Sequence, residues 1–173
     1  MRIILRSALV GLVALVAIGA FLASRPAPTN EVPNLETIAN KYVTLVIDYG
    51  SEANRSVDVF DLHQVPNSST GWDVLRQARA QVQGTDNFPT GFVCRINWWP
   101  SVAEQSCKET PKANQGHWAY FVTNLELGKG WIVSGQGSAT HIPDCGGFEG
   151  WSWVPAGKSI TPPRYEVSVR GCK

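Results

Sequence analysis

The sequence predicts an α+β domain in which one helix packs on a mixed β-sheet. Short β-branched and aromatic runs bounded by Gly, Pro and Asn recur along the chain, as is typical of strands. One segment alone has clear helical periodicity. Six of the seven tryptophans fall within residues 91–153. This strand-rich, tryptophan-dense region indicates a compact domain with a large aromatic core or an aromatic face.

The first two strands are expected to form a hairpin. Tyr42–Tyr49 is apolar on both faces, which predicts a strand covered on both sides. Ser56–Val65 alternates between apolar and polar residues, and Pro66 ends it. Because only a short polar turn separates the two runs, we expect them to pair.

The helix is expected over Thr70–Gln83. Thr70 is suited to cap it, and Asp73 stands where a capping box places its acid. Gly84 is expected to end it. The apolar stripe that would face the sheet comprises Val74, Leu75, Ala78 and Val82.

Five further strands are expected after the helix, separated by long polar loops such as 97–115. They are Gly91–Asn97, His117–Val122, Gly130–Ser134, Glu149–Trp153 and Tyr165–Arg170. Two strands, one helix and then five strands correspond to an α+β layout of β-grasp type.

The N-terminus predicts export. Arg2 and Arg6 precede an uncharged apolar run over residues 7–24, so residues 1–24 are expected to be a signal peptide or an uncleaved signal anchor. As a helix this run would span about 27 Å, close to the hydrocarbon thickness of a membrane. The charge distribution favours an anchor, a single-pass hydrophobic helix with its N-terminus inside. Residues 25–40 read as a Pro-rich linker to a domain at 41–173 that lies outside the cell membrane, or is secreted if the signal is cleaved.

Four cysteines fit that compartment. Four cysteines allow three disulfide pairings, and a zinc site would need closely spaced ligand pairs that this chain does not have. We expect Cys94 to pair with Cys107, and Cys145 with Cys172. The first bridge would staple the long loop, and the second would tie the last strand to the loop after Trp131.

Several functional classes lack support in the sequence. The net charge of +1 and the absence of a Lys/Arg cluster argue against a nucleic-acid partner. His63, His117 and His141 have no metal-ligand spacing, and no G-x-S-x-G nucleophile motif occurs. We therefore expect no catalytic residues, no metal and no cofactor.

The order of five motifs resembles the transcobalamin-like C-terminal domain, in the form found in exported actinobacterial proteins. The motifs are 42–50, Gly71–Leu75, Gly91–Asn97, Trp118–Tyr120 and Glu149–Trp153, and the match covers roughly residues 42–163. The resemblance implies a β-grasp-like fold and, by analogy with vitamin B12 carriers, a wall of a corrinoid site. Trp98 stands where the family has a glycine.

The tryptophans admit two interpretations, a buried core or a ligand groove. Large aromatic side chains supply the apolar burial that a small domain needs, but the adjacent Trp98 and Trp99 are expected at an exposed turn. The candidate ligand-binding residues are Trp98, Trp99, Trp118, Tyr120, Trp151 and Trp153.

Two functional hypotheses follow. The first is a membrane-tethered or secreted, non-catalytic binding module for a small molecule of vitamin or corrinoid type, which would dock mainly by apolar burial. The alternative is an accessory or structural subunit of a cell-envelope or uptake complex that grips a partner protein through an edge strand.

Overall fold

The computed structural model describes residues 40–112, 114–124, 129–168 and 172. In this part of the chain, five strands form a mixed sheet in the order β2-β1-β7-β5-β6, and two more strands form a small second sheet. One α-helix, α2, accompanies them, so the predicted α+β class is confirmed. The predicted signal segment 1–24, with its hydrophobic helix, lies outside the described residues, as does the linker except for Asn40.

The hairpin at the start of the domain forms as predicted. β1 (Asn40–Asp48) pairs antiparallel with β2 (Asp58–Pro66), and the short 3-10 helix η1 (Ser51–Ala53) lies in the connection between them. Val43, Leu45, Val46 and Ile47 are fully buried, because β1 is covered on both faces. β2 is an edge strand of the sheet.

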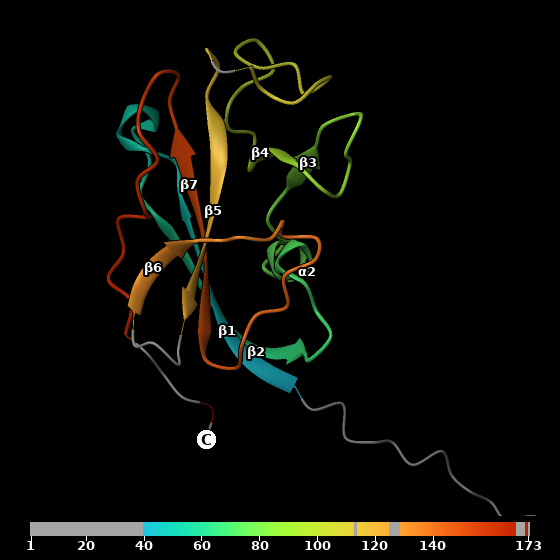
Figure 1. Ribbon diagram of the computed structural model, residues 1–173, viewed down its shortest axis with the longest axis vertical. Helices are drawn as coiled ribbons and strands as arrows, with labels where there is room; N and C mark the ends of the chain where they lie inside the picture. The colour runs from blue at the N-terminus through green and yellow to red at the C-terminus, as the bar shows by residue number, and fades with distance from the viewer. Residues whose placement is uncertain (1–39, 113, 125–128, 169–171, 173) are drawn as a thin grey trace, which may run out of the picture. The chain divides into compact units, whose positions relative to one another are not determined.

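The sheet is completed by three strands from the second half of the chain (Figure 1). β7 (Gly147–Val154) runs parallel to β1 and antiparallel to β5 (His117–Asn124). β6 (Lys129–Val133) pairs with β5 at the far edge. β1, from the start of the domain, and β7, from near its end, therefore lie side by side within the sheet.

The helix begins where it was predicted and ends six residues early. α2 covers Gly71–Gln77, with a complete capping box between Thr70 and Asp73. The prediction that it continues to Gln83 is wrong. Ala78 caps the helix, and Arg79 takes the left-handed conformation with φ of 58°.

Pairing with a later strand redirects the chain after the helix. Val82–Gly84 forms β3, which pairs antiparallel with β4 (Val93–Ile96). Asn97 also fixes the turn, since its backbone N–H donates to the carbonyl of Gln81 at 2.8 Å and its Oδ1 accepts from the Gln81 N–H at 2.9 Å. Gly84 therefore ends a strand, not the helix.

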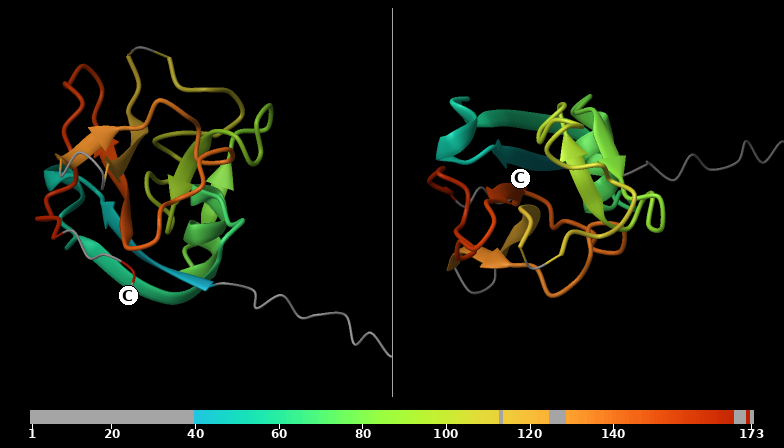
Figure 2. Two further views of the ribbon diagram at one scale, coloured as in Figure 1. Left: turned by 60° about the horizontal axis from the view of Figure 1, so that its bottom comes forward. Right: turned by 90° about the horizontal axis from the view of Figure 1, so that it is seen from above.

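α2 and the β3–β4 pair lie over one face of the five-stranded sheet (Figure 2). The main core fills the space between these layers and includes Trp72, Leu75, Ile96, Trp118, Tyr120, Trp151 and Trp153. On the opposite face, Trp131 packs near Ala119, Phe121 and Val154.

The predicted C-terminal strand is not present in its described part. Tyr165–Ser168 has no strand pairing. This segment is instead held by side chains: Trp131 Nε1 donates to the Tyr165 carbonyl at 2.9 Å, and Arg164 binds Asp48. Alternation in the sequence indicated a strand, but side-chain bonds take the place of a ladder here.

Both predicted disulfides are confirmed. Cys94–Cys107 and Cys145–Cys172 each have a Cα–Cα distance of 5.6 Å. Within the described ranges, no helix has both the length and the apolar character needed to cross a membrane.

Candidate functional site

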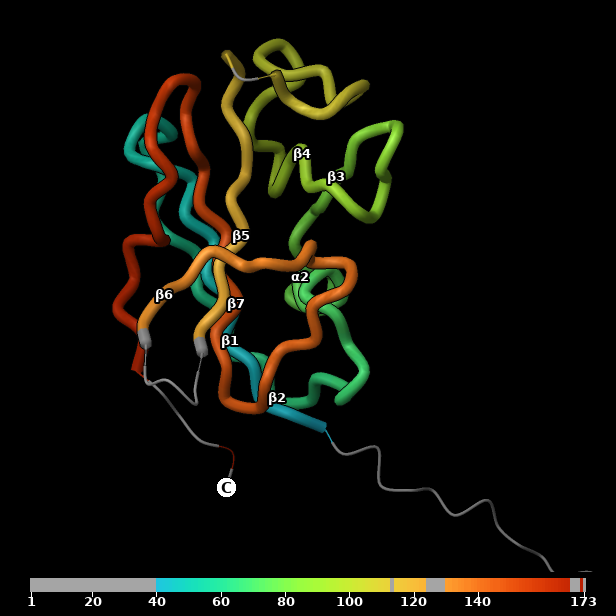
Figure 3. The backbone as a smooth tube through the Cα atoms, viewed as in Figure 1, coloured from blue at the N-terminus to red at the C-terminus, as the bar shows by residue number. Residues whose placement is uncertain are grey.

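Three cavities open around Pro155, at the end of the sheet where the parallel strands β1 and β7 finish. The loop 97–116, η1 and the loop after β7 gather at this end (Figure 3). Pro155 lines all three cavities. Loops clustered at one end of a rigid sheet are a common location for binding sites.

The first of these, which we name the tryptophan cavity, has a volume of about 360 Å³. Its walls include Glu52, Trp99, Glu104, Gln105, Gln115 and Trp153. Aromatic walls with a few polar groups at the rim are typical of small-molecule sites.

Trp153 forms one wall and is held by neighbours on several sides. It lies on β7 with 8% exposure. Its ring contacts Trp99 edge-to-face at 6.3 Å between centroids, and Trp118 at 5.6 Å. Gly116 allows this packing, because a Cβ at that position would collide with the Trp153 ring. These contacts therefore restrict the position of the indole.

Trp99 forms the adjoining wall and is placed by a tight turn. Asn97 and Trp98 both have positive φ, 47° and 67°, and Trp99 returns to form a bridge with Ile96. Trp118 Nε1 donates to the Trp99 carbonyl at 3.3 Å. The Nε1 of Trp99 is itself buried without an acceptor.

A buried arginine on β4 holds the loop that carries Trp99 in place. Arg95, on β4, is 4% exposed. Its Nε donates to the Pro100 carbonyl at 2.6 Å and its Nη2 to the Gln105 carbonyl at 2.5 Å. The neighbouring disulfide Cys94–Cys107 closes the same loop. The tryptophan cavity is therefore preformed, with a rigid wall on each side.

Two further cavities adjoin it. The lysine cavity, of about 360 Å³, includes Lys112, His117 and Lys158 and shares Gln115 and Pro155 with the tryptophan cavity. The arginine cavity, of about 330 Å³, lies beside Arg164 and shares Trp153 with the tryptophan cavity.

The structure brings together only some of the six predicted binding residues. Trp99 and Trp153 line the tryptophan cavity, and Trp118 packs behind them. Trp98 is 71% exposed and lines none of the four cavities described here. Tyr120 and Trp151 are buried and stack on each other at 4.8 Å, away from the cavity lining.

Tyr120 belongs to a buried polar cluster that was not predicted from the sequence. Glu149, on β7, is 1% exposed, accepts a short hydrogen bond from the Tyr120 hydroxyl and lies 3.3 Å from His141 Nε2. Lys41, 4% exposed, donates to the Pro143 carbonyl at 2.6 Å. These groups tie the loop before β7 to the sheet.

The pKa values in this cluster follow from burial and pairing. Burial raises the pKa of Glu149, although His141 and Tyr120 oppose this shift. The hydrogen bond to Glu149 raises the pKa of His141. Burial lowers the pKa of Lys41 against the attraction of Glu149. None of the four cavities described here is lined by these side chains.

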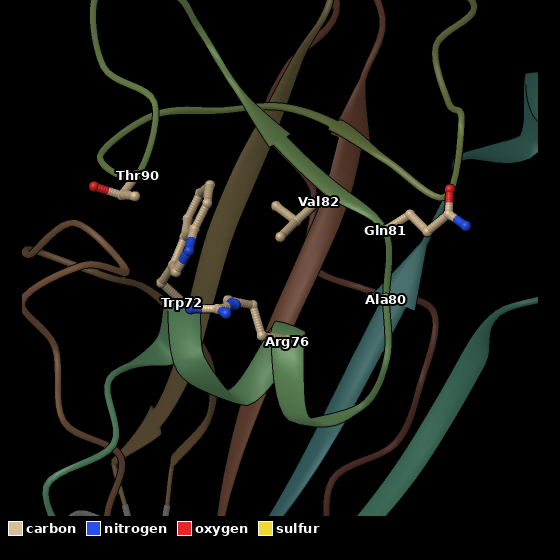
Figure 4. Close-up of a pocket in the computed structure, with 6 residues that line it drawn as sticks. All are labelled: Trp72, Arg76, Ala80, Gln81, Val82 and Thr90. Atoms are coloured by element: carbon tan, nitrogen blue, oxygen red, sulfur yellow. The ribbon is translucent and has the colours of Figure 1, made fainter.

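A fourth cavity lies elsewhere and is a shallow groove between α2 and β3. It has a volume of about 460 Å³ and is lined by Trp72, Arg76, Val82 and Thr90, among others (Figure 4). Trp72 stands on α2 with its ring beside Val82 across the groove. One aromatic wall and an open mouth enclose a ligand less well than the paired indoles of the tryptophan cavity.

Sequence reasoning missed Glu52 and Glu104, which come from separate loops with no shared spacing. It also missed Glu149, for which a signal existed: an acid inside a strand that is otherwise apolar and aromatic. Among the described residues, no three His, Cys, Asp or Glu side chains form a group that could hold a metal ion.

No family model, curated protein or solved structure matches the chain. We therefore infer the function from the geometry of the cavities.

Proposed function

We propose that this domain is a non-catalytic, extracytoplasmic binding module that holds a small molecule in the tryptophan cavity. One observation carries the proposal: Trp99 and Trp153, from distant parts of the sequence, face a common preformed cavity of about 360 Å³. Rigid aromatic side chains lose little conformational entropy when a ligand binds, and this favours binding. The rim amides of Asn114 and Gln115 supply polar contacts that orient the ligand.

The extracytoplasmic location is supported by the two disulfides. Disulfides persist in oxidising compartments and are rare in the cytosol. All four cysteines of the chain are paired. The apolar segment 1–24 would export the domain and, if uncleaved, hold it at the cell membrane with the domain outside.

A β-grasp-like arrangement is part of the proposal. It is supported by the helix that follows the first hairpin and by the order β2-β1-β7-β5-β6, with β1 parallel to β7. Kinship with transcobalamin-like domains would suggest a vitamin or corrinoid ligand. A whole corrinoid is larger than the tryptophan cavity, so this site would take either a smaller vitamin-like molecule or one edge of a corrinoid.

The experiment tests a panel of small-molecule fragments and vitamins for binding. The indole N–H resonances of the seven tryptophans are used to detect it. We expect binders to shift Trp99 and Trp153. Trp99→Ala should abolish binding, and the exposed neighbour Trp98→Ala should preserve it. Because Trp99 also packs on the core, the rim variant Asn114→Ala/Gln115→Ala provides a second test that leaves the indoles in place. Binders that leave Trp99 and Trp153 unshifted and are unaffected by these variants would contradict the proposal.

A second candidate function, a protein-interaction subunit, is supported by β2. It is a nine-residue edge strand with Val59 39% exposed, and unpaired strand edges can accept a strand from another chain. In co-purification from membranes, Val59→Lys should release such a partner, whereas Trp99→Ala should retain it. Retention in both variants would contradict this function.

A further inference from the structure

The tryptophan and lysine cavities adjoin each other but carry opposite charge. Among the described residues that line them, the tryptophan cavity has two acids, Glu52 and Glu104, and no base. The lysine cavity has Lys112 and Lys158 and no acid. Gln115 and Pro155 line both, so a ligand can extend from one into the other.

The tryptophan cavity has the features that recognise an organic cation. Tryptophan attracts an ammonium group more strongly than other aromatic side chains, and two indoles, Trp99 and Trp153, line this cavity. Glu104 carries its negative charge at neutral pH, because hydrogen bonds from the Ser101 hydroxyl and backbone N–H lower the pKa of its carboxyl. Glu52 adds a second carboxylate from η1.

The lysine cavity has the features that recognise an anion. Lys112 and Lys158 approach it from two loops, and His117 at the start of β5 adds an imidazole that can donate an N–H hydrogen bond. Phe92 and Pro111 provide apolar surface beside them. Ammonium groups next to such surface bind a carboxylate or a phosphate by charge-assisted hydrogen bonds.

We infer that the ligand is a zwitterion, with an ammonium group in the tryptophan cavity beside Trp99, Trp153 and the two glutamates, and a carboxylate or phosphate group beside Lys112 and Lys158. This inference rests on the proposed function and specifies its ligand class. The two cavities, each of about 360 Å³, together fall within the usual size range of ligand sites. A zwitterion satisfies both sets of charges at once, which neither a cation nor an anion does.

The test compares probes that carry both charges with probes that carry one or none. Carnitine and phosphocholine carry both, and they distinguish a carboxylate from a phosphate at the anionic end. Choline carries only the cation, acetate and inorganic phosphate only the anion, and the tert-butyl analogue of choline is neutral. We expect at least one zwitterion to bind about tenfold more tightly than either of its halves.

Exposed charges allow matched variants that leave the core untouched. The double variant Glu52→Gln/Glu104→Gln should lower the affinity for choline and for the zwitterion about tenfold and leave the affinity for the anions unchanged. The double variant Lys112→Gln/Lys158→Gln should lower the affinity for the anions and for the zwitterion and leave the affinity for choline unchanged. The control is Lys108→Gln/Glu109→Gln, which changes two exposed charges that line neither cavity.

The outcomes separate this inference from the proposed function. If the neutral analogue shifts the Trp99 and Trp153 resonances as strongly as the zwitterions do, and the charge variants change nothing, the zwitterion is wrong while the cavity remains a binding site. If the panel of fragments and vitamins binds only elsewhere, the proposed function fails together with this inference.

Discussion

Arg164 and Asp48 lie 116 positions apart in the sequence, yet they form a two-pronged ion pair at the end of β1. Arg164 Nη2 donates to Asp48 Oδ1 at 2.7 Å and its Nε to Oδ2 at 2.9 Å, while its backbone N–H donates to Oδ2 at 2.7 Å. Asp48 is 2% exposed. The segment after β7 is therefore fastened to the first strand by one buried carboxylate.

Removing the arginine side chain should loosen this segment. Arg164→Ala leaves the Asp48 carboxylate without its charged donor, so we expect the free energy of unfolding to fall by about 2 kcal/mol. Urea denaturation at neutral pH measures the change. Arg76→Ala, at an exposed position on α2, is the control and should stay within about 0.5 kcal/mol of the parent. Equal midpoints for the two variants would show that the ion pair contributes nothing.

Gly71 should tolerate no side chain. A Cβ there would overlap the Tyr120 hydroxyl and lie 2.7 Å from Glu149 Oε2, at the point where α2 begins. We expect Gly71→Ala to lower stability by about 3 kcal/mol through overpacking of the buried cluster. Gly135→Ala is the matched control, because a Cβ there meets nothing within 4 Å. Thermal melts of the two variants decide the question, and a Gly71→Ala midpoint equal to the control would refute the packing argument.

Stability should decline as pH rises above neutrality. The hydrogen bond to Glu149 raises the pKa of His141 above its unfolded value of 6.5. The protonated imidazole therefore stabilises the fold below pH 6.5, and this contribution is lost as pH rises through the folded pKa. Melting temperatures recorded from about pH 6 to 9 should show the fall.

The variant His141→Gln should show a clearly smaller decline over this range. His63→Gln, at an exposed position on β2, should retain the full decline. An unchanged pH dependence in His141→Gln would assign the effect to another group.

The two disulfides should differ in their effect on binding more than on stability. Their loops span 13 and 27 residues, which predicts losses of about 3 and about 3.5 kcal/mol when each is removed. Only Cys94–Cys107 closes the loop that carries Trp99. Cys94→Ser/Cys107→Ser should therefore weaken ligand binding in the tryptophan cavity, whereas Cys145→Ser/Cys172→Ser should not. Equal loss of affinity in both double variants would mean that the loop is held by other contacts.

Features that depend only on residues close together in the sequence could be predicted from it. The capping box of Thr70 and Asp73 needs only its own spacing, and the strand at 42–49 follows from a continuous apolar run. The end of α2 was not predictable in this way. Val82 fits the apolar stripe of a helix, but in the structure it belongs to β3 and pairs with Ile96 of β4. This long-range pairing overrides the local helical periodicity.

The candidate site could be predicted only in part for a similar reason. Its tryptophans stand out in the sequence, but which of them face a cavity depends on one turn: positive φ at Trp98 turns that residue outward and returns Trp99 to the domain. Glu52 and Glu104 come from loops whose positions are set by strand order. No spacing in the sequence links those two acids to Trp153.

The parallel pairing of β1 and β7 has a practical consequence for handling the domain. Both strands start at one end of the sheet and finish beside the cavities, so Asn40 lies about 30 Å from them, the length of a nine-residue strand. A sensor chip or bead that captures the domain at the Asn40 end of β1 would leave all three openings facing the solution, where ligands can enter freely.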